Sequence, residues 1–167
     1  MRLFDHKFKE NKKRYIGQCF FAAIFIFGIL TLMDIAYDIV VAASIGASAF
    51  IAFTMPHAQS SRARYLIGGY FIGATSGVVM NYFYSYLLLA NIPCSPHMLT
   101  AIAGAMAVGL AMFFMTVCNM EHPPAVALAL GLTRERNVLM AALAAMISII
   151  LMSLIKRLFI KKFVNLL

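Results

Sequence analysis

Long uncharged apolar runs are the feature that most limits what this chain can fold into. From Ile16 to Met33 the sequence contains no Asp, Glu, Lys or Arg, and similar stretches recur as far as Ile155. A bilayer core about 30 Å thick is crossed by roughly 20 apolar helical residues, so such runs are typical of membrane helices. Apolar residues make up 63% of the 167 and charged residues 12%, which excludes an ordinary water-soluble domain. The sequence therefore predicts an all-α, polytopic helical membrane protein.

Six apolar segments can be marked along the chain, and together they form a single transmembrane domain over residues 16–155. Two of them are interrupted or short, so we expect five to six membrane segments, including two broken or re-entrant short helices. Asp34 and Asp38 follow the first segment and are interpreted as an exposed loop pair. The segments are 16–33, 35–54, 65–90, 98–115, 123–132 and 137–155.

The second and fifth segments contain the candidate helix breaks. Small residues interrupt the second segment at positions 44–48, where a helix could break. The fifth segment follows the sequence His-Pro-Pro at 122–124, and proline is tolerated in the first turn of a helix because its missing N–H is not required there. A helix from Pro123 to Leu132 would be about 15 Å long at 1.5 Å per residue. It would therefore span about half a bilayer.

The basic residues lie at the ends of apolar segments, so the net charge of +8 indicates membrane topology and not nucleic-acid binding. With six crossings, the basic amino terminus (1–15) and the basic carboxyl tail (156–167) both face the cytoplasm. Only Arg134 and Arg136 then violate the positive-inside rule. A five-crossing alternative, with a re-entrant fifth segment, would place the tail charges outside. We expect a multi-pass protein of the inner (plasma) membrane with a cytoplasmic amino terminus.

The two halves of the domain, about 16–90 and 98–155, can be aligned with one another. Each contains a span, a short segment, a loop with two arginines and a closing span, and residues 44–50 fall opposite 120–126. Three crossings per half would make the halves inverted copies, an arrangement by which transporters place two broken helices near the midplane. One arginine pair would then lie at each mouth and could concentrate anions there. These mouth charges are Arg62, Arg64, Arg134 and Arg136.

Three glycines in the third segment share one helix face. Gly69, Gly73 and Gly77 follow one another at four-residue intervals, a spacing that lets another helix approach closely. We favour packing within one protomer over a dimer seam, and a homo-oligomer is left open. Asn81 lies on the same helix and is expected to bond to a neighbouring helix.

An ordered set of short motifs resembles the HPP family of integral membrane proteins. The set comprises Gly-Ala-Ser-Ala at 46–49, Pro-His at 56–57, Arg-x-Arg at 62–64, Leu-Ile-Gly-Gly at 66–69 and His-Pro-Pro-Ala at 122–125. With the order of the spans, the resemblance covers most of residues 16–155. Plant chloroplast members of that family are linked to nitrite transport, so the resemblance implies a transport role with nitrite as the suspected anion.

Helix amino ends inside the membrane form the candidate anion site, because they present unpaired amides and a partial positive charge. The expected donors are the amides of 125–127 and 46–48, together with serine hydroxyls. His122 is expected either to organise the break or also to exchange a proton, and both readings stay open. The candidate substrate-binding residues are Ser44, Gly46, Ala47, Ser48, Asn119, Glu121, His122, Pro123, Pro124, Ala125 and Val126.

The predicted function is therefore transport of a small inorganic anion by a carrier or a channel, with the lipid bilayer and the anion as partners. The sequence contains no HExxH, GxSxG or zinc-spaced cysteine pattern, so no enzyme activity, metal or cofactor is expected. One alternative is a non-transporting scaffold or sensor subunit. A membrane-embedded enzyme is a less favoured one.

Overall fold

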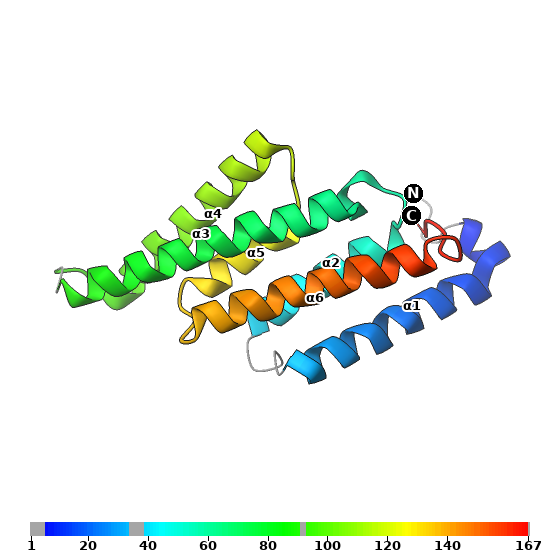
Figure 1. Cartoon of the computed structure of the whole chain (residues 1–167), viewed down its shortest axis with the longest axis horizontal. Coiled ribbons are helices and arrows are strands. Elements are labelled where there is room, and N and C mark those ends of the chain that lie inside the picture. Colours follow the sequence, from blue (N-terminus) through cyan, green and yellow to red (C-terminus); the bar gives the residue numbers. More distant parts are fainter. Residues whose placement is uncertain (1–5, 34–38, 91–92, 167) are drawn as a thin grey trace.

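The computed structural model describes residues 6–33, 39–90 and 93–166, and over these residues it consists of helices and short connections (Figure 1). Asp34 and Asp38 lie outside the described residues. The helices are α1 (His6–Met33), α2 (Ile39–Thr54), α3 (Ala63–Leu89), α4 (Pro96–Cys118), α5 (Pro123–Leu132) and α6 (Val138–Phe159), with a 3-10 turn, η2 (Gln59–Ser61), before α3.

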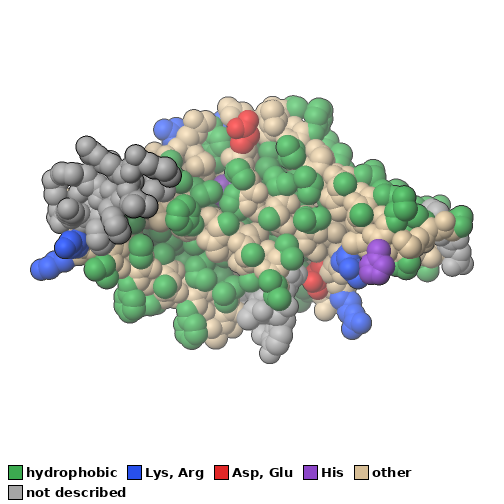
Figure 2. Space-filling model, turned by 180° about the vertical axis from the view of Figure 1, so that it is seen from behind, with side chains coloured by type: hydrophobic (Ala, Val, Ile, Leu, Met, Phe, Trp, Pro, Cys, Tyr) green, Lys and Arg blue, Asp and Glu red, His purple; other side chains and the backbone are tan. Residues whose placement is uncertain are grey.

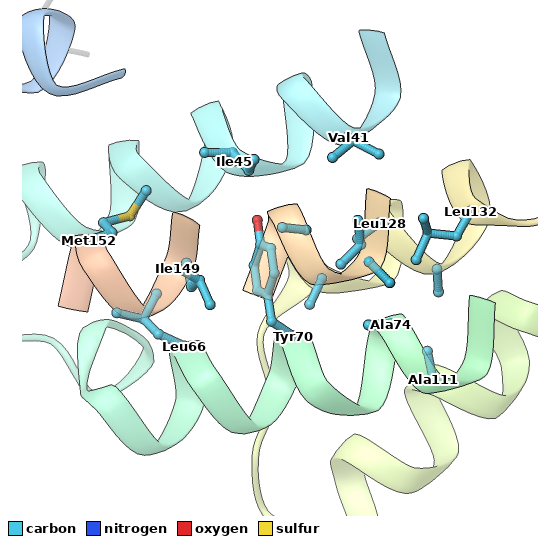
Figure 3. Packing of buried hydrophobic residues seen from close by; sticks show 14 of the residues in the cluster. Val41, Ile45, Leu66, Tyr70, Ala74, Ala111, Leu128, Leu132, Ile149 and Met152 are labelled. Carbon is cyan, nitrogen blue, oxygen red and sulfur yellow. The ribbon is translucent and has the colours of Figure 1, made fainter. Parts of the chain in front are cut away.

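Helix α3 lies at the centre of the bundle. It packs against α4, α5 and α6, whereas α2 contacts α5 and α6 and also carries most of the contact with α1 (Figure 1). Buried apolar side chains from α2, α3, α5 and α6 interlock between these helices, with Ile45, Leu66, Leu128 and Ile149 all fully buried (Figure 3). The core therefore lies between α2, α3, α5 and α6, and α1 and α4 flank it.

Within the described part of the chain, three helices are long and apolar enough to cross a membrane: Asn11–Thr31 within α1, and all of α4 and α6. Helices α2 and α5 are apolar but shorter. Helix α3 has 27 residues, and its Gly, Ser, Thr, Asn and Tyr residues lower its hydropathy. Several of these residues, including Gly73, Ser76 and Asn81, are buried against neighbouring helices. The number of crossings stays a prediction.

Many large apolar side chains are exposed on the outer surface, more than is usual for a water-soluble protein. Phe27 is 73% exposed, Leu89 is 82% exposed and Leu158 is 78% exposed. Hydrophobic side chains cover the middle of the face seen in Figure 2, and charged side chains are sparse there. An apolar surface of this extent marks contact with lipid or another apolar partner.

The start and the end of the described chain lie at the same end of the bundle (Figure 1). The Tyr15 hydroxyl donates to the Leu166 carbonyl oxygen at 3.0 Å, and the Leu166 N–H donates to the Thr54 carbonyl oxygen at 2.8 Å. Gln18 is buried and donates to the Val164 carbonyl oxygen at 2.9 Å. The segment predicted only as a basic tail thus folds back and packs on α1 and α2.

The expected break at residues 44–48 is absent, and this prediction is wrong. Helix α2 runs without interruption from Ile39 to Thr54. The Ser44 hydroxyl donates to the Val41 carbonyl oxygen at 2.8 Å, and the Ser48 hydroxyl donates to the Ser44 carbonyl oxygen at 3.0 Å. Serines that bond to their own helix in this way sit in an apolar helix without unpaired polar groups. A stretch of small residues therefore permits close packing without breaking the helix.

The start of α5 follows from three local signals. Asn119 adopts a left-handed conformation (φ 52°), and the Met120 N–H reaches back to the Met115 carbonyl oxygen at 2.9 Å, which ends α4 as in a Schellman motif. His122 is extended because a residue that precedes proline avoids helical angles. Pro123 then opens α5, and the predicted bounds Pro123–Leu132 are confirmed.

The end of α5 is held by one side chain of α3. The amide nitrogen Nδ2 of Asn81 lies 3.0 Å, 3.2 Å and 2.9 Å from the carbonyl oxygens of Leu132, Thr133 and Glu135. These carbonyls belong to the last residue of α5 and to the residues just after it, where backbone acceptors lack helical partners. The expected bond from Asn81 to a neighbouring helix is therefore present, and it caps the short helix.

Candidate functional site

Helix α5 packs against the glycine face of α3, which is formed by Gly69, Gly73 and Gly77. A Cβ atom built on Gly69 would fall 2.5 Å from the Cβ of His122, and one built on Gly77 would fall 2.8 Å from the Ala129 carbonyl oxygen. At Gly73 such an atom would overlap the Ala125 carbonyl oxygen. No real Cβ approaches its neighbours so closely, so only glycine lets the two backbones meet here. Because the contacts advance together along both chains, α5 runs parallel to α3.

This packing places His122 deep between three helices. The ring is 1% exposed, and its Nε2 lies 2.9 Å from the Ser48 hydroxyl oxygen of α2. The same oxygen lies 2.8 Å from the Tyr70 hydroxyl of α3, which is also fully buried. Figure 3 shows the Tyr70 side chain directed from α3 toward α2. The start of α5 is thus joined to both neighbouring helices through one histidine and two hydroxyl groups.

The protons in this cluster can be arranged in two ways. If Ser48 donates to the Ser44 carbonyl oxygen, its oxygen accepts the Nε2–H of His122, and the Nδ1 of a neutral ring carries no proton. If Ser48 instead donates to Nε2, the neutral ring carries its proton on Nδ1. The hydroxyl of Tyr70 can serve either arrangement as a donor to Ser48. The state of Nδ1 therefore depends on the orientation of one serine hydroxyl.

Within the described part of the chain, the second ring nitrogen of His122 is not hydrogen-bonded. Nδ1 is fully buried, and among the described residues no atom makes a hydrogen bond of normal geometry with it. The backbone of Ser60 lies near enough to act on the ring electrostatically, without meeting that geometry. Buried polar atoms in native proteins are nearly always paired, so an unpaired one calls for a ligand, a water molecule or a functional role.

A cavity of about 370 Å³ adjoins this histidine, between the last turns of α4 and the first turn of α5. The cavity is not enclosed and opens at the surface of the bundle. Apolar side chains form most of its wall, and Glu121 is exposed at its edge. The lining residues are Met112, Met115, Thr116, Glu121, His122, Pro123 and Val126.

The backbone amides expected to bind an anion are engaged in the helices. The Ala125 N–H donates to the His122 carbonyl oxygen at 2.9 Å, and the two prolines before it have no N–H. The amides of 126–127 lie inside α5, and those of 46–48 lie inside the continuous α2, so both sets have helical acceptors. Prolines suit the first turn of a helix because they lack the N–H groups that would have no partner there. The same N–H groups would be the donors for an anion, so the prolines remove them. The donors that remain near the cavity belong to side chains.

The other predicted site residues are divided between the cluster and the surface. Ser44 and Ser48 are buried, and the Ser44 hydroxyl oxygen lies 3.4 Å from the Tyr70 hydroxyl. Ala47 is exposed on the opposite face of α2, and Gly46 has no atom within 4 Å of a Cβ built on it. Asn119 is exposed and accepts from the Tyr65 hydroxyl at 3.4 Å.

The two arginine pairs lie at opposite ends of the bundle. Arg62 immediately precedes α3 and Arg134 follows α5, and these two helices run in the same direction. Arg62, Arg64, Arg134 and Arg136 are all exposed. The two pairs are therefore separated along the bundle, and their role as mouth charges stays a prediction.

Tyr70 is the residue of the cluster that the sequence interpretation missed. It is a single hydroxyl-bearing aromatic residue directly after Gly69, in a helix with several other tyrosines. Its only available signal was its position beside the glycine face, which places it toward the same neighbouring helices.

One comparison with known proteins gave a match. The model of a protein family described as "HPP, transmembrane region" matches residues 9–159, which include all of α2 to α6. No curated protein and no solved structure matches the chain.

Proposed function

The chain belongs to the HPP family of membrane proteins, and from this premise we propose that it moves a small inorganic anion across the bilayer, with nitrite as the first candidate. The matched region contains the His122–Ser48–Tyr70 cluster and the cavity beside it. Nitrite is suggested by the family resemblance, and the selectivity for it is part of the proposal.

The observation that carries this proposal is the unpaired Nδ1 of His122 at the start of a half-length helix. A helix amino end carries a partial positive charge, and α5 directs this end toward His122 from within the bundle. Burial strengthens such an interaction because little water screens it. No Lys or Arg lines the cavity, so the site suits an anion of low charge and not a multivalent one.

Binding of an anion at His122 requires a proton on the Nδ1 atom of its ring. A bare lone pair on Nδ1 would repel an anion, whereas an Nδ1–H donates to it. The ring reaches that state either when Ser48 donates to Nε2 or when both ring nitrogens are protonated. In the second case a proton enters the site together with the anion. Uptake that accelerates at lower pH would favour this second route.

The helix directions support an inverted arrangement of the two halves. Val40 contacts Gly131 and Ser48 contacts His122, so α2 and α5 run in opposite directions. Helix α3 likewise contacts α6, its counterpart in the other half. We therefore extend the proposal to an inverted 3+3 repeat that encloses the site where α2 and α5 cross. The short helix α5 corresponds to the broken helix expected in the second half. Its counterpart in the first half, α2, is continuous.

The experiment is anion uptake into proteoliposomes that contain the purified chain. Nitrite, nitrate, formate and chloride are compared across pH 5.5 to 8, a working range around the reference histidine pKa of about 6.5. Wild-type protein is expected to accumulate nitrite above the level of empty liposomes. A non-transporting scaffold would give no uptake of any of the four anions.

Two substitutions of His122 separate the roles of its ring nitrogens. In His122→Gln the amide nitrogen can take the position of Nε2 and keep the contact with Ser48, but the Nδ1 donor is lost. In His122→Asn the amide nitrogen can take the position of Nδ1, but the contact with Ser48 is lost. We expect uptake by the Gln variant to fall about 10-fold or more, because hydrogen bonds to charged groups contribute about 1.5–3 kcal/mol. The Gln variant should unfold at nearly the wild-type temperature.

The matched control is Ser48→Ala, which removes the hydroxyl that positions the ring but leaves Nδ1 intact. It should reduce uptake less than His122→Gln and should lower the stability more. Wild-type uptake by all these variants would show that the cluster holds the helices together and takes no part in transport.

A further inference from the structure

A second concavity, whose lining does not include His122, lies at the end of the bundle where the described chain ends meet. It has a volume of about 520 Å³ and is formed by the connection between α2 and α3 and by the last turns of α6. We call it the basic pocket, because its lining contains the cations Arg62, Lys156 and Arg157 together with His57. The lining contains no Asp or Glu.

Lys156 anchors the basic pocket. It is only 7% exposed, and its ammonium group donates both to the backbone carbonyl oxygen and to the hydroxyl oxygen of Ser61. The guanidinium group of Arg62 is close enough to repel it. Buried cations are normally accompanied by an anion, yet among the described residues the groups found to act on the Lys156 ammonium are the neutral Ser61 and the positive Arg62.

The last turn of α6 explains only part of this cluster. Lys156 and Arg157 lie at the carboxyl end of α6, where the helix dipole stabilises positive charge. Arg62, however, stands at the amino end of α3, where the dipole disfavours a cation. No side chain caps this end of α3, and Ala63 in its first turn lines the pocket. A helix amino end beside two arginines is a combination that binds phosphate.

We propose that the basic pocket binds the phosphate of an anionic phospholipid headgroup. One guanidinium group can donate two parallel hydrogen bonds to two oxygens of a phosphate. Arg62 and Arg157 are both exposed at the rim of the basic pocket. Pro56 and Ile160 add apolar wall, which suits the glycerol part of a lipid better than free phosphate. Basic pockets between helices at the cytoplasmic side of membrane proteins recognise headgroups of this kind. The inference does not depend on transport.

The test measures thermal unfolding of the delipidated full chain in detergent. Dioctanoyl phosphatidylglycerol, dioctanoyl phosphatidylcholine and inorganic phosphate are titrated separately. The test variant is Arg62→Gln with Arg157→Gln, and the control is Arg134→Gln with Arg136→Gln at the opposite end. Both doubles remove two exposed cations, so they are matched in charge.

Phosphatidylglycerol should stabilise the wild type and the control in a saturable manner. In the test variant its half-saturating concentration should rise about 30-fold, because two basic contacts to the headgroup are lost. Equal stabilisation by phosphatidylcholine would overturn the proposal, and so would an equal loss in both double variants. Stabilisation by inorganic phosphate at the same concentrations would overturn the assignment to a lipid and assign the pocket to a free anion.

Discussion

Substitution of a glycine on the face of α3 should destabilise the protein through one identifiable contact. A Cβ added at Gly73 overlaps the Ala125 carbonyl oxygen, which belongs to the backbone of α5 and cannot rotate away. Gly28 in α1 is the matched control, because a Cβ added there meets nothing within 4 Å. Both positions lie inside helices, so Gly→Ala brings the same gain in helix propensity, at most about 1 kcal/mol.

The difference between the two variants therefore isolates the steric cost at Gly73. Overpacking by one methyl group typically costs about 1–3 kcal/mol, and a backbone neighbour places Gly73→Ala toward the upper end. At this chain length each kcal/mol lowers the unfolding temperature by about 2–4 °C. Gly73→Ala should therefore unfold about 2–12 °C below Gly28→Ala.

The assay is thermal unfolding of both variants in the same detergent, with expression level as a second reading. Gly73→Leu should prevent stable assembly, whereas Gly28→Leu should accumulate normally. Gly77→Ala provides an internal gradation, because its Cβ would lie 2.8 Å from the Ala129 carbonyl oxygen. Equal unfolding temperatures for the Gly73 and Gly28 variants would refute the close approach of α5 to α3.

Three further predictions concern the short helix and the topology. Asn81→Ala removes the donor that caps α5 and should cost about 1–3 kcal/mol, whereas Thr75→Ala on the exposed face of the same helix should cost little; thermal unfolding compares them. Pro123→Ala combined with Pro124→Ala frees His122 to become helical, so nitrite uptake should fall with little loss of stability, and unchanged uptake would show that the prolines are structural only. Reporter fusions should place both chain ends in the cytoplasm, and a carboxyl end outside would remove the six-crossing topology.

The helices and the short fifth segment follow from local chemistry that the sequence displays directly. Apolar runs of sufficient length form helices in lipid because every backbone N–H and C=O must be satisfied internally. The start of α5 follows from Pro123, since proline and its predecessor restrict their own backbone angles. The spacing of Gly69, Gly73 and Gly77 indicated a close-packed face without naming the helix that meets it.

Only the tertiary structure decided which side chains meet. The contact of Ser48 with His122 and Tyr70 joins residues 74 and 22 positions apart and depends on how α2, α3 and α5 rotate about their axes. The continuity of α2 through 44–48 was likewise set by its neighbours, because small residues permit either a break or close packing. The hydrogen bond from Lys156 to Ser61 likewise joins residues that are 95 positions apart. Each of these contacts is a relation between helix faces, and local backbone preferences do not specify it.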